Sequence, residues 1–281
     1  MLKQNIYALN KVIFIKREST MCGIFGFISK KPISLFKVFG ILEKLEAHQY
    51  PQEPTPIGGY GTGIALLDSN GQAIVEKVGK IGAVSPTKKL AETVDFSEAR
   101  VLVGHVRMPS PEFMDTARFK EAAQPYIVKS DRLTVVSVHN GKVANYKELR
   151  SGLGKAHVFE SEKFELIDSE IIPHVYAELL SEKQDSDASL YELLCTLQGS
   201  SAIALLQLEK DKTFLHFVHK GKTRGLTIWT NEHDELIFCS RKEPLIAEFG
   251  DVLRKGNFAE RISIAYHEDT GLKLSFPISL K

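Results

Sequence analysis

Cysteine is scarce in this chain of 281 residues, and the three that occur form no recognisable set. Cys22, Cys195 and Cys239 are odd in number and widely separated, so their spacing fits neither a disulfide framework nor a metal site. We therefore expect a reducing compartment, the cytoplasm, and no bound metal.

An excess of charge of either sign is also missing. The 36 Lys and Arg residues face 35 Asp and Glu residues, which gives a formal net charge of +1. Proteins that bind nucleic acids or anionic membranes electrostatically carry a basic excess. The composition therefore predicts no nucleic-acid partner and favours small ligands.

Long apolar runs are absent as well. Residues 12–15 are apolar, but the basic pair 16–17 follows them and leaves too short a segment for a signal peptide. No later run approaches the roughly 20 residues of a membrane helix. The glycine-rich run 58–63 leads into an expected strand instead of a helix, which argues against a nucleotide-binding loop. We expect no membrane association and no cofactor.

The sequence contains many short apolar runs of the length of a β-strand. Hydrophobic residues make up 43% of the chain, which is enough for a large core. Such runs, bounded by turn residues, occupy 63–67, 100–104, 133–138, 201–206, 214–218 and 235–239. Helices are expected over 35–45 after the cap Ser34, over 171–180, and over 190–197 after the capping box Ser189 to Glu192. Many strands with few helices favour two sheets packed face to face with helices outside.

Cys22 differs from the other cysteines because it directly follows Met21 and precedes an apolar segment. Removal of Met21 would leave a thiol and a free α-amine on one residue, a nucleophile with its own base. Cys195 on the apolar side of a helix and Cys239 at a strand end are explained by packing. Packing is also the commoner role of a single cysteine, so Cys22 needs support from other segments.

Arg107 ends an expected strand and begins a loop containing Pro109 and Pro111. Its guanidinium offers a fixed fork for a carboxylate, which lysine lacks. A solvated cation at a strand end is the plainer interpretation, and Arg107 alone leaves both open.

Asn140 and Gly141 follow another apolar strand. Asn-Gly is the commonest signal of a tight hairpin turn. The alternative is an oxyanion hole made by the Asn140 amide and the Gly141 N–H group. Asn145, with Glu148 three residues later, is expected to cap a helix.

Asp168 stands near an expected helix start, because Pro173 is tolerated only in a first turn. It fits an ordinary N-cap. It fits equally well a carboxylate that binds the ammonium group of a ligand.

Four motifs occur in order: Met-Cys-Gly-Ile-Phe-Gly at 21–26, Gly-His-Val-Arg at 104–107, His-Asn-Gly-x-x-x-Asn-Tyr at 139–146 and Asp-Ser-Glu at 168–170. Together they resemble the class II glutamine amidotransferases, the glutaminase branch of the N-terminal nucleophile hydrolases. The resemblance covers the chain from Met21 onward and implies an α+β fold, the four-layer αββα sandwich. Gln124 and Pro125 match a further family segment, to which we assign no catalytic role.

The resemblance implies a role for each matching residue. Cys22 would be the nucleophile. Arg107 would bind the α-carboxylate of L-glutamine, and Asp168 would bind its α-ammonium group. Asn140 and Gly141 would hold the oxyanion.

Two segments depart from the family pattern. Residues 56–61 replace a segment that usually contains Arg-Gly, and they lack the arginine. Met108, Pro109 and Pro111 occupy a loop where the family often has an aromatic residue and later a histidine. The departures concern pocket closure and coupling to an acceptor more than the chemistry.

The expected reaction is hydrolysis of L-glutamine to L-glutamate and ammonia through a γ-glutamyl thioester on Cys22. It requires Cys22 to be the first residue. Either 1–21 would be a propeptide, or translation would start at Met21 and an aminopeptidase would remove that methionine. Residues 22–281 would be the glutaminase domain. Because no acceptor domain is recognisable, we prefer a glutaminase subunit that supplies ammonia to a separate synthase subunit. The alternatives are a hydrolase of another γ-glutamyl amide and a non-catalytic glutamine-sensing regulatory subunit.

Overall fold

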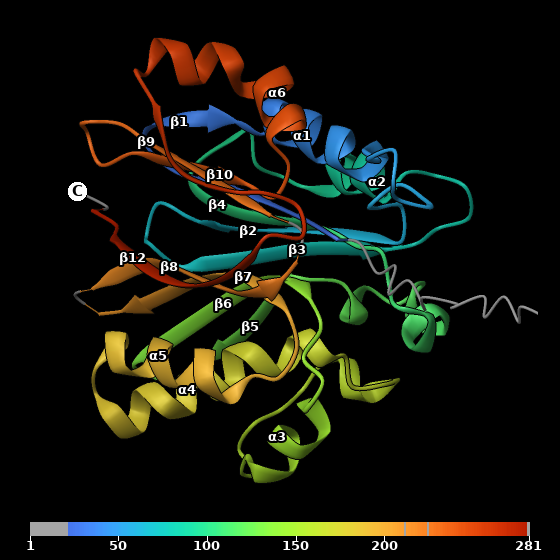
Figure 1. The fold of residues 1–281 in the computed structure, drawn as a ribbon, viewed down its shortest axis with the longest axis vertical. Coiled ribbons are helices and arrows are strands. Elements are labelled where there is room, and N and C mark those ends of the chain that lie inside the picture. Colours follow the sequence, from blue (N-terminus) through green and yellow to red (C-terminus); the bar gives the residue numbers. More distant parts are fainter. Residues whose placement is uncertain (1–21, 211, 224, 280–281) are drawn as a thin grey trace, which may run out of the picture.

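Two antiparallel β-sheets stacked face to face form the centre of the molecule (Figure 1). The computed structural model describes residues 22–210, 212–223 and 225–279. The expected N-terminal extension, residues 1–21, lies outside this described part.

The larger sheet contains β1 (Gly23–Ser34), β2 (Gly61–Leu67), β3 (Ala73–Gly79), β4 (Glu98–Val106), β9 (Leu226–Thr230), β10 (Leu236–Cys239) and β11 (Ala259–Ile264). The smaller sheet contains β5 (Tyr126–Lys129), β6 (Leu133–Gly141), β7 (Ser201–Glu209), β8 (Thr213–Lys222) and β12 (Asp269–Pro277). The helices are α1 (Leu35–Ala47), α2 (Pro86–Thr93), α3 (Tyr146–Gly152), α4 (Ile171–Lys183), α5 (Ser186–Thr196) and α6 (Lys242–Lys255).

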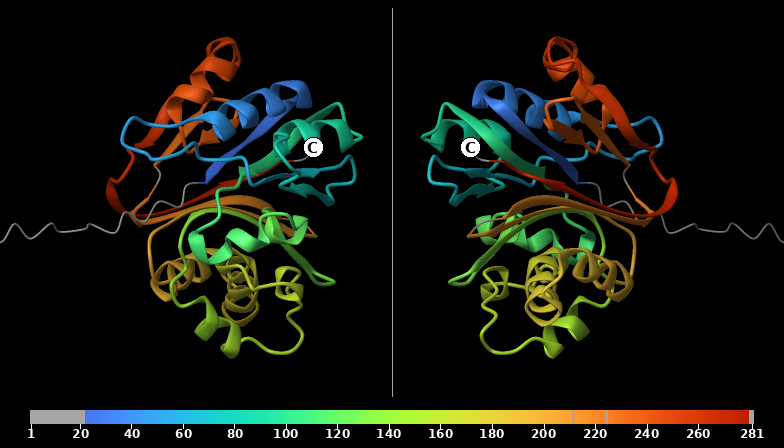
Figure 2. Two further views of the ribbon diagram at one scale, coloured as in Figure 1. Left: turned by 90° about the vertical axis from the view of Figure 1, so that its right-hand side faces the viewer. Right: turned by 90° about the vertical axis from the view of Figure 1, so that its left-hand side faces the viewer.

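The strand order is β11-β9-β10-β1-β4-β2-β3 in the larger sheet and β12-β8-β7-β6-β5 in the smaller. Helices α1, α2 and α6 cover the outer face of the larger sheet, and α3, α4 and α5 lie on the outer side of the smaller one (Figure 1). Both views of Figure 2 show the same order of helix, sheet, sheet and helix layers. The predicted α+β class and four-layer αββα sandwich are confirmed.

The inner layer explains why several strands read as continuous apolar runs. Strands β2, β4, β6 and β7 are buried on both faces, one against the other sheet and one against helices. Between the sheets, the rings of Phe217 and Phe238 meet edge to face with centroids 4.9 Å apart. Each such side chain contributes about 1.5–3 kcal/mol of apolar burial, so this layer holds the sheets at a fixed separation.

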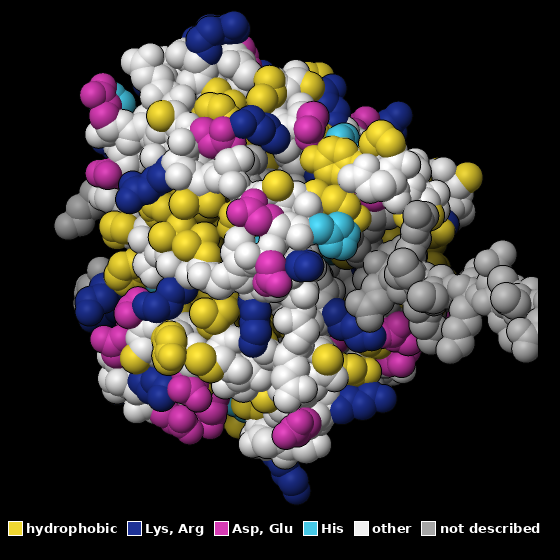
Figure 3. Space-filling model, in the orientation of Figure 1, with side chains coloured by type: hydrophobic (Ala, Val, Ile, Leu, Met, Phe, Trp, Pro, Cys, Tyr) yellow, Lys and Arg dark blue, Asp and Glu magenta, His cyan; other side chains and the backbone are white. Residues whose placement is uncertain are grey.

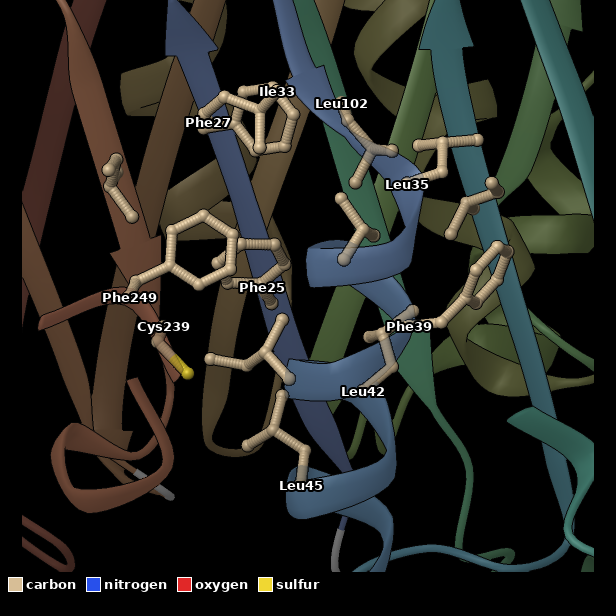
Figure 4. Close-up of a cluster of buried hydrophobic side chains, with 14 of the residues drawn as sticks. Phe25, Phe27, Ile33, Leu35, Phe39, Leu42, Leu45, Leu102, Cys239 and Phe249 are labelled. Carbon is tan, nitrogen blue, oxygen red and sulfur yellow. The ribbon is translucent and has the colours of Figure 1, made fainter. Parts of the chain in front are cut away.

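The outer core packs α1 and α6 on the larger sheet (Figure 4). The Phe25 and Phe249 rings lie 5.0 Å apart, and Cys239 is buried in the same cluster. Burial raises the pKa of the Cys239 thiol to about 12, so it stays protonated. The packing role predicted for Cys239 is confirmed.

Of two helix caps predicted from the sequence, one is confirmed and one was wrong. Ser34 caps α1, and its hydroxyl accepts a hydrogen bond from the Phe36 N–H at 3.3 Å. The capping box at Ser189 was wrong, because α5 begins earlier and its cap is Asp185, which accepts from the Ala188 N–H at 2.7 Å. Ser189 lies inside the helix, where its hydroxyl donates to the Asp185 carbonyl at 2.7 Å.

Cys195 is exposed on α5, so the packing role expected for it was wrong. The buried face of α5 contains Leu190 and Leu193, and with about 3.6 residues per turn Cys195, two residues after Leu193, lies on the opposite side of the helix. On the face shown in Figure 3, acidic and basic side chains are interspersed. Within the described part of the chain, every helix is too short or too polar to cross a membrane.

Candidate active site

A narrow pocket opens where the start of β1 meets the ends of β4 and β6. Its lining residues come from both sheets: Cys22, Arg107, Met108, Pro109, Ser110, Phe113, Ala122, Gln124, His139, Gly141, Lys142, Ile167, Asp168 and Ser169. Gly23 pairs with Val106 in the β1–β4 ladder, which brings the two residues next in line, Cys22 and Arg107, to the same end of the sheet. Four of the five predicted site residues therefore meet in one pocket.

Cys22 is half-buried at the wall of this pocket. Its Sγ lies 3.4 Å from the backbone nitrogen of Met108 and 3.4 Å from the Met108 carbonyl oxygen. The Met108 N–H donates to the sulfur, and such a donor favours the negative charge that a thiol develops when it reacts.

Arg107 is only 4% exposed, so its interpretation as a solvated strand-end cation was wrong. Its Nη2 donates to Thr116 Oγ1 at 2.7 Å, and that hydroxyl donates to the Phe113 carbonyl at 2.6 Å. Burial lowers the pKa of Arg107, while nearby Tyr126 and Cys22 oppose this effect. The guanidinium is thus fixed in place by the 3₁₀ turn that begins at Pro111.

Asp168 is buried beside Gly141 and does not act as an N-cap. Its Oδ2 accepts a hydrogen bond from the Val143 N–H at 2.8 Å, and Ser169 Oγ donates to its Oδ1 at 3.4 Å. Burial raises the pKa of Asp168 to about 6, against the lowering effect of the backbone donors of Val143 and Ser169. The carboxylate faces the pocket at the start of the turn that leads into α4.

Asn140 and Gly141 form the end of β6 and do not form a hairpin turn. Gly141 has φ of 141°, and a Cβ there would lie 2.0 Å from the Ser200 carbonyl oxygen, so only glycine fits. Asn140 points to the other face of the strand. It is fully buried, does not line the pocket, and neither side-chain amide atom has a hydrogen-bond partner among the described residues.

Asn145 occupies the N-cap position of α3, as expected, but its side chain makes no capping hydrogen bond. Its Nδ2 donates to the Thr196 carbonyl at 3.0 Å, and its Oδ1 accepts from the Gln198 N–H at 3.0 Å. Asn145 therefore fastens the segment after β6 to the connection between α5 and β7.

Two further side chains line the pocket: His139, which the sequence analysis gave no role, and Gln124, which it named without a catalytic role. His139 N–H donates to Gln124 Oε1 at 2.6 Å, and Gln124 Nε2 donates back to the His139 carbonyl at 3.1 Å. The Gln124 amide thus extends the β5–β6 ladder by one pair. Burial lowers the pKa of His139 to about 3, so its imidazole is neutral.

The loop after Arg107 forms part of the pocket lining through Met108, Pro109 and Ser110. Glu112 on this loop forms a 3.0 Å ion pair with Lys142, the residue after Gly141, which sequence reasoning also missed. Among the residues that the structure describes, no group of three or more His, Cys, Asp and Glu side chains is arranged to hold a metal ion.

Comparison with known proteins agrees with this geometry. Residues 114–247 match a family model described as a glutamine amidotransferase domain. The isomerizing glutamine–fructose-6-phosphate aminotransferase of Sulfolobus acidocaldarius is 31% identical over 198 residues, which are 68% of this chain and 29% of that protein. The enzyme of the same name from Thermosynechococcus vestitus is 30% identical over 239 residues, 82% of this chain and 30% of the relative. The chain thus spans less than a third of these relatives.

Solved structures support the same fold. One described as the allosteric regulatory enzyme of purine biosynthesis superposes with a TM-score of 0.61 at 16% identity, covering 92% of this chain and 50% of the other. Glutamine phosphoribosylpyrophosphate amidotransferase from B. subtilis gives a TM-score of 0.58 at 18% identity, with the same coverage. The fold is that of the N-terminal nucleophile hydrolases. With the matching family model and relatives, the chain contains a class II glutamine amidotransferase domain.

Proposed function

We propose that residues 22–281 form a glutaminase domain that hydrolyses L-glutamine to L-glutamate and ammonia, with Cys22 as the nucleophile. One observation carries the proposal: a thiol, a buried guanidinium and a buried carboxylate line the same narrow pocket. They belong to Cys22, Arg107 and Asp168.

The two buried charges match the two ends of a free amino acid. Arg107 can hold an α-carboxylate through its fork of N–H groups, and Asp168 can accept from an α-ammonium group. Both are anchored by protein partners, so they fix the orientation of the ligand before reaction. The side-chain amide of glutamine then lies toward Cys22.

The Gly141 N–H group, at the pocket lining, is the first donor of the oxyanion hole in this proposal, and the Asn140 side-chain amide, which lies outside the lining, is the second. The Asn140 amide supports this role because a buried amide left without a partner costs about 1–3 kcal/mol, and a developing oxyanion would supply the missing acceptor. The loss of one such donor raises a barrier by about 3 kcal/mol.

The chemistry needs only the two groups of an N-terminal Cys22. Its α-amine, with an ordinary pKa of about 7.7–8, takes the thiol proton while Sγ adds to the carboxamide carbon. The amine then passes that proton to the leaving nitrogen, the C–N bond breaks, and ammonia departs from a γ-glutamyl thioester. Water adds to the thioester carbon and gives a proton to the amine. The C–S bond breaks, glutamate leaves, and the amine returns the proton to the sulfur.

This scheme requires that residues 1–21 are absent from the active protein, because an acylated nitrogen is not a base. Intact-mass measurement of protein from its native cells tests the requirement. A mature chain beginning at Cys22 is expected, and an active species that begins at Met1 would reject the mechanism.

The decisive experiment is labelling with a diazoketone analogue of L-glutamine, followed by peptide mapping. We expect the label on Cys22 alone, with protection by L-glutamine and no label in Cys22→Ser. Exposed Cys195 is a stringent internal control, since a non-specific reagent would modify it first. Label on Cys195 or Cys239 would overturn the assignment.

We further propose that the ammonia goes to a separate synthase subunit. The aligned relatives are more than three times as long as the aligned region, and their names describe transfer to fructose 6-phosphate. Co-purification should recover a synthase that stimulates hydrolysis. Full activity of the isolated chain would favour the alternative of a free γ-glutamyl amide hydrolase, which a substrate panel distinguishes.

A further inference from the structure

The imidazole of His139, a residue that lines the pocket, lies between two serine hydroxyls. Its Nδ1 lies 2.8 Å from Ser169 Oγ, and its Nε2 lies 3.1 Å from Ser201 Oγ. The ring is buried on the helix side of β6, beneath the pocket. Neither contact follows from the motif that contains His139, because Ser169 and Ser201 come from other elements.

The direction of the hydrogen bonds around the ring depends on which nitrogen carries the proton, since the neutral imidazole has one N–H group. In the Nδ1–H tautomer, His139 donates to Ser169 Oγ, which leaves the Ser169 hydroxyl proton for Asp168 Oδ1 at 3.4 Å. Nε2 is then the acceptor of the Ser201 hydroxyl proton. In that tautomer the chain of donors runs from Ser201 through His139 and Ser169 to the carboxylate of Asp168.

The same ring supports Gly141. Ser201 is the cross-strand partner of Gly141, and a Cβ on Gly141 would lie 2.9 Å from His139 Nε2. The ring therefore packs directly under the Gly141 backbone. Gln124 holds the His139 backbone at both its N–H and its carbonyl, so the ring cannot shift along the strand.

We propose that His139 is a positioning residue that holds the two halves of the site through its two ring nitrogens. Nδ1 holds Asp168 through Ser169. Nε2, fixed by Ser201, holds the backbone of Gly141. This inference rests on the proposed glutaminase function, in which Asp168 binds the substrate and Gly141 stabilises the oxyanion.

Two serine variants test the two contacts of the His139 ring separately, Ser169 at Nδ1 and Ser201 at Nε2. Ser169→Ala should raise KM for L-glutamine about tenfold, with kcat within about twofold, because it releases the ammonium ligand. Ser201→Ala should lower kcat about tenfold with KM within about twofold, because it releases the oxyanion side. Ser169→Thr and Ser201→Thr, which keep the hydroxyl, should recover most of each loss.

Ser137→Ala is the matched control. Ser137 is fully buried on the same face of β6, two residues before His139, and its hydroxyl has no hydrogen-bond partner in the described part of the chain. Its kcat and KM should equal those of the wild type. Serine variants that match this control, or that change kcat and KM by the same factor, would overturn the proposal.

Nitrogen NMR on protein with ring-labelled histidine tests the hydrogen-bond chain without turnover. The His139 signal, assigned by its loss in His139→Gln, should show the neutral Nδ1–H tautomer, and Ser169→Ala should remove this preference. An Nε2–H tautomer overturns the inference. A wild-type protein that neither hydrolyses L-glutamine nor reacts at Cys22 would reject the proposed function instead. In that case the tautomer of His139 would still show whether the hydrogen-bond chain from Ser201 to Asp168 exists.

Discussion

Arg241 and Glu53, 188 residues apart in the sequence, form an ion pair whose side chains are both completely withdrawn from solvent. The Arg241 guanidinium also lies 4.2 Å from the ring centroid of Tyr50 and 5.1 Å from that of Tyr266. The proline-rich loop after α1 is thereby fixed to the end of β10. The segment that follows this loop lacks the arginine usual in the family. The loop itself is held by Arg241, an arginine from the C-terminal part of the chain.

This ion pair is linked through the backbone to the segment that begins at Cys22, the proposed nucleophile. Ser240, next to Arg241, receives a hydrogen bond at its Oγ from the Ile24 N–H at 3.0 Å and donates its own N–H to the Ile24 carbonyl at 2.9 Å. Ile24 is two residues from Cys22. The loop, the end of β10 and the start of β1 thus form one connected unit.

Breaking the pair from one side should destabilise the protein strongly. Glu53→Gln and Arg241→Met each leave a buried charge without its partner, which costs about 3–5 kcal/mol. The double variant Glu53→Leu/Arg241→Met removes both charges and should recover most of the loss. Urea unfolding measures all three. A double variant as unstable as the sum of the single variants would contradict this account.

Activity and stability should respond to pH in opposite directions at Asp168. The folded pKa is raised from 3.8 to about 6, so the native state binds more protons than the unfolded state between these values. Its contribution to stability therefore falls as the pH rises from about 4 to 6, while kcat/KM rises because the ionised form binds the ammonium group.

Asp168→Asn checks this assignment. The variant should lose the acid limb of the kcat/KM profile, with KM raised about a hundredfold, and should be at least as stable as the wild type at pH 7. Glu170, whose pKa burial raises to about 7, is the control. If the acid limb shifted in Glu170→Gln and stayed unchanged in Asp168→Asn, the titrating carboxylate would be Glu170 and the assignment to Asp168 would be wrong.

Arg107 should be irreplaceable by lysine. Arg107→Lys keeps the charge but loses the fork, so KM for L-glutamine should rise by the equivalent of about 2–5 kcal/mol, with a much smaller change in kcat. Thr116→Val removes the hydroxyl that accepts a hydrogen bond from the Arg107 guanidinium at 2.7 Å. It should raise KM about fivefold. Equal KM values in Arg107→Lys and wild type would exclude carboxylate binding by this residue.

Two asparagines of one motif should behave as opposites. Asn140→Ala should lower kcat by about a hundredfold or more, with KM nearly unchanged and no loss of thermal stability, because the amide is unsatisfied in the free protein. Asn145→Ala breaks two hydrogen bonds to backbone groups and should lose about 1–3 kcal/mol of stability with kcat retained. Steady-state kinetics and calorimetry on both proteins measure the contrast.

The buried half of the fold could be predicted from the sequence because burial on both faces leaves an unbroken apolar run. Strands β11 and β12 were missed, since their residues alternate between exposed and half-buried and their pairing comes from β9 and β8. Helix α6, which carries a mixed polar sequence, was also missed. Its partner is the core around Phe249.

Some features of the candidate site could likewise be predicted from the sequence, and others could not. The resemblance of four ordered motifs to a known family was enough to group Cys22, Arg107 and Asp168, whereas each residue taken alone left its role open. The burial of Arg107, the bridging role of Asn145 and the contacts of His139 depend on which strands and turns become neighbours. No local pattern encodes these neighbours.

The pocket draws its two chemical halves from different sheets: Cys22 and Arg107 from the larger, Gly141 from the end of β6 in the smaller. The spacing between the proposed nucleophile and the proposed oxyanion donor is therefore set by the apolar layer between the sheets, which includes Ile24 and Val138. If the chain hydrolyses L-glutamine as proposed, we expect pressure or a cavity in that layer to slow the reaction while the protein remains folded.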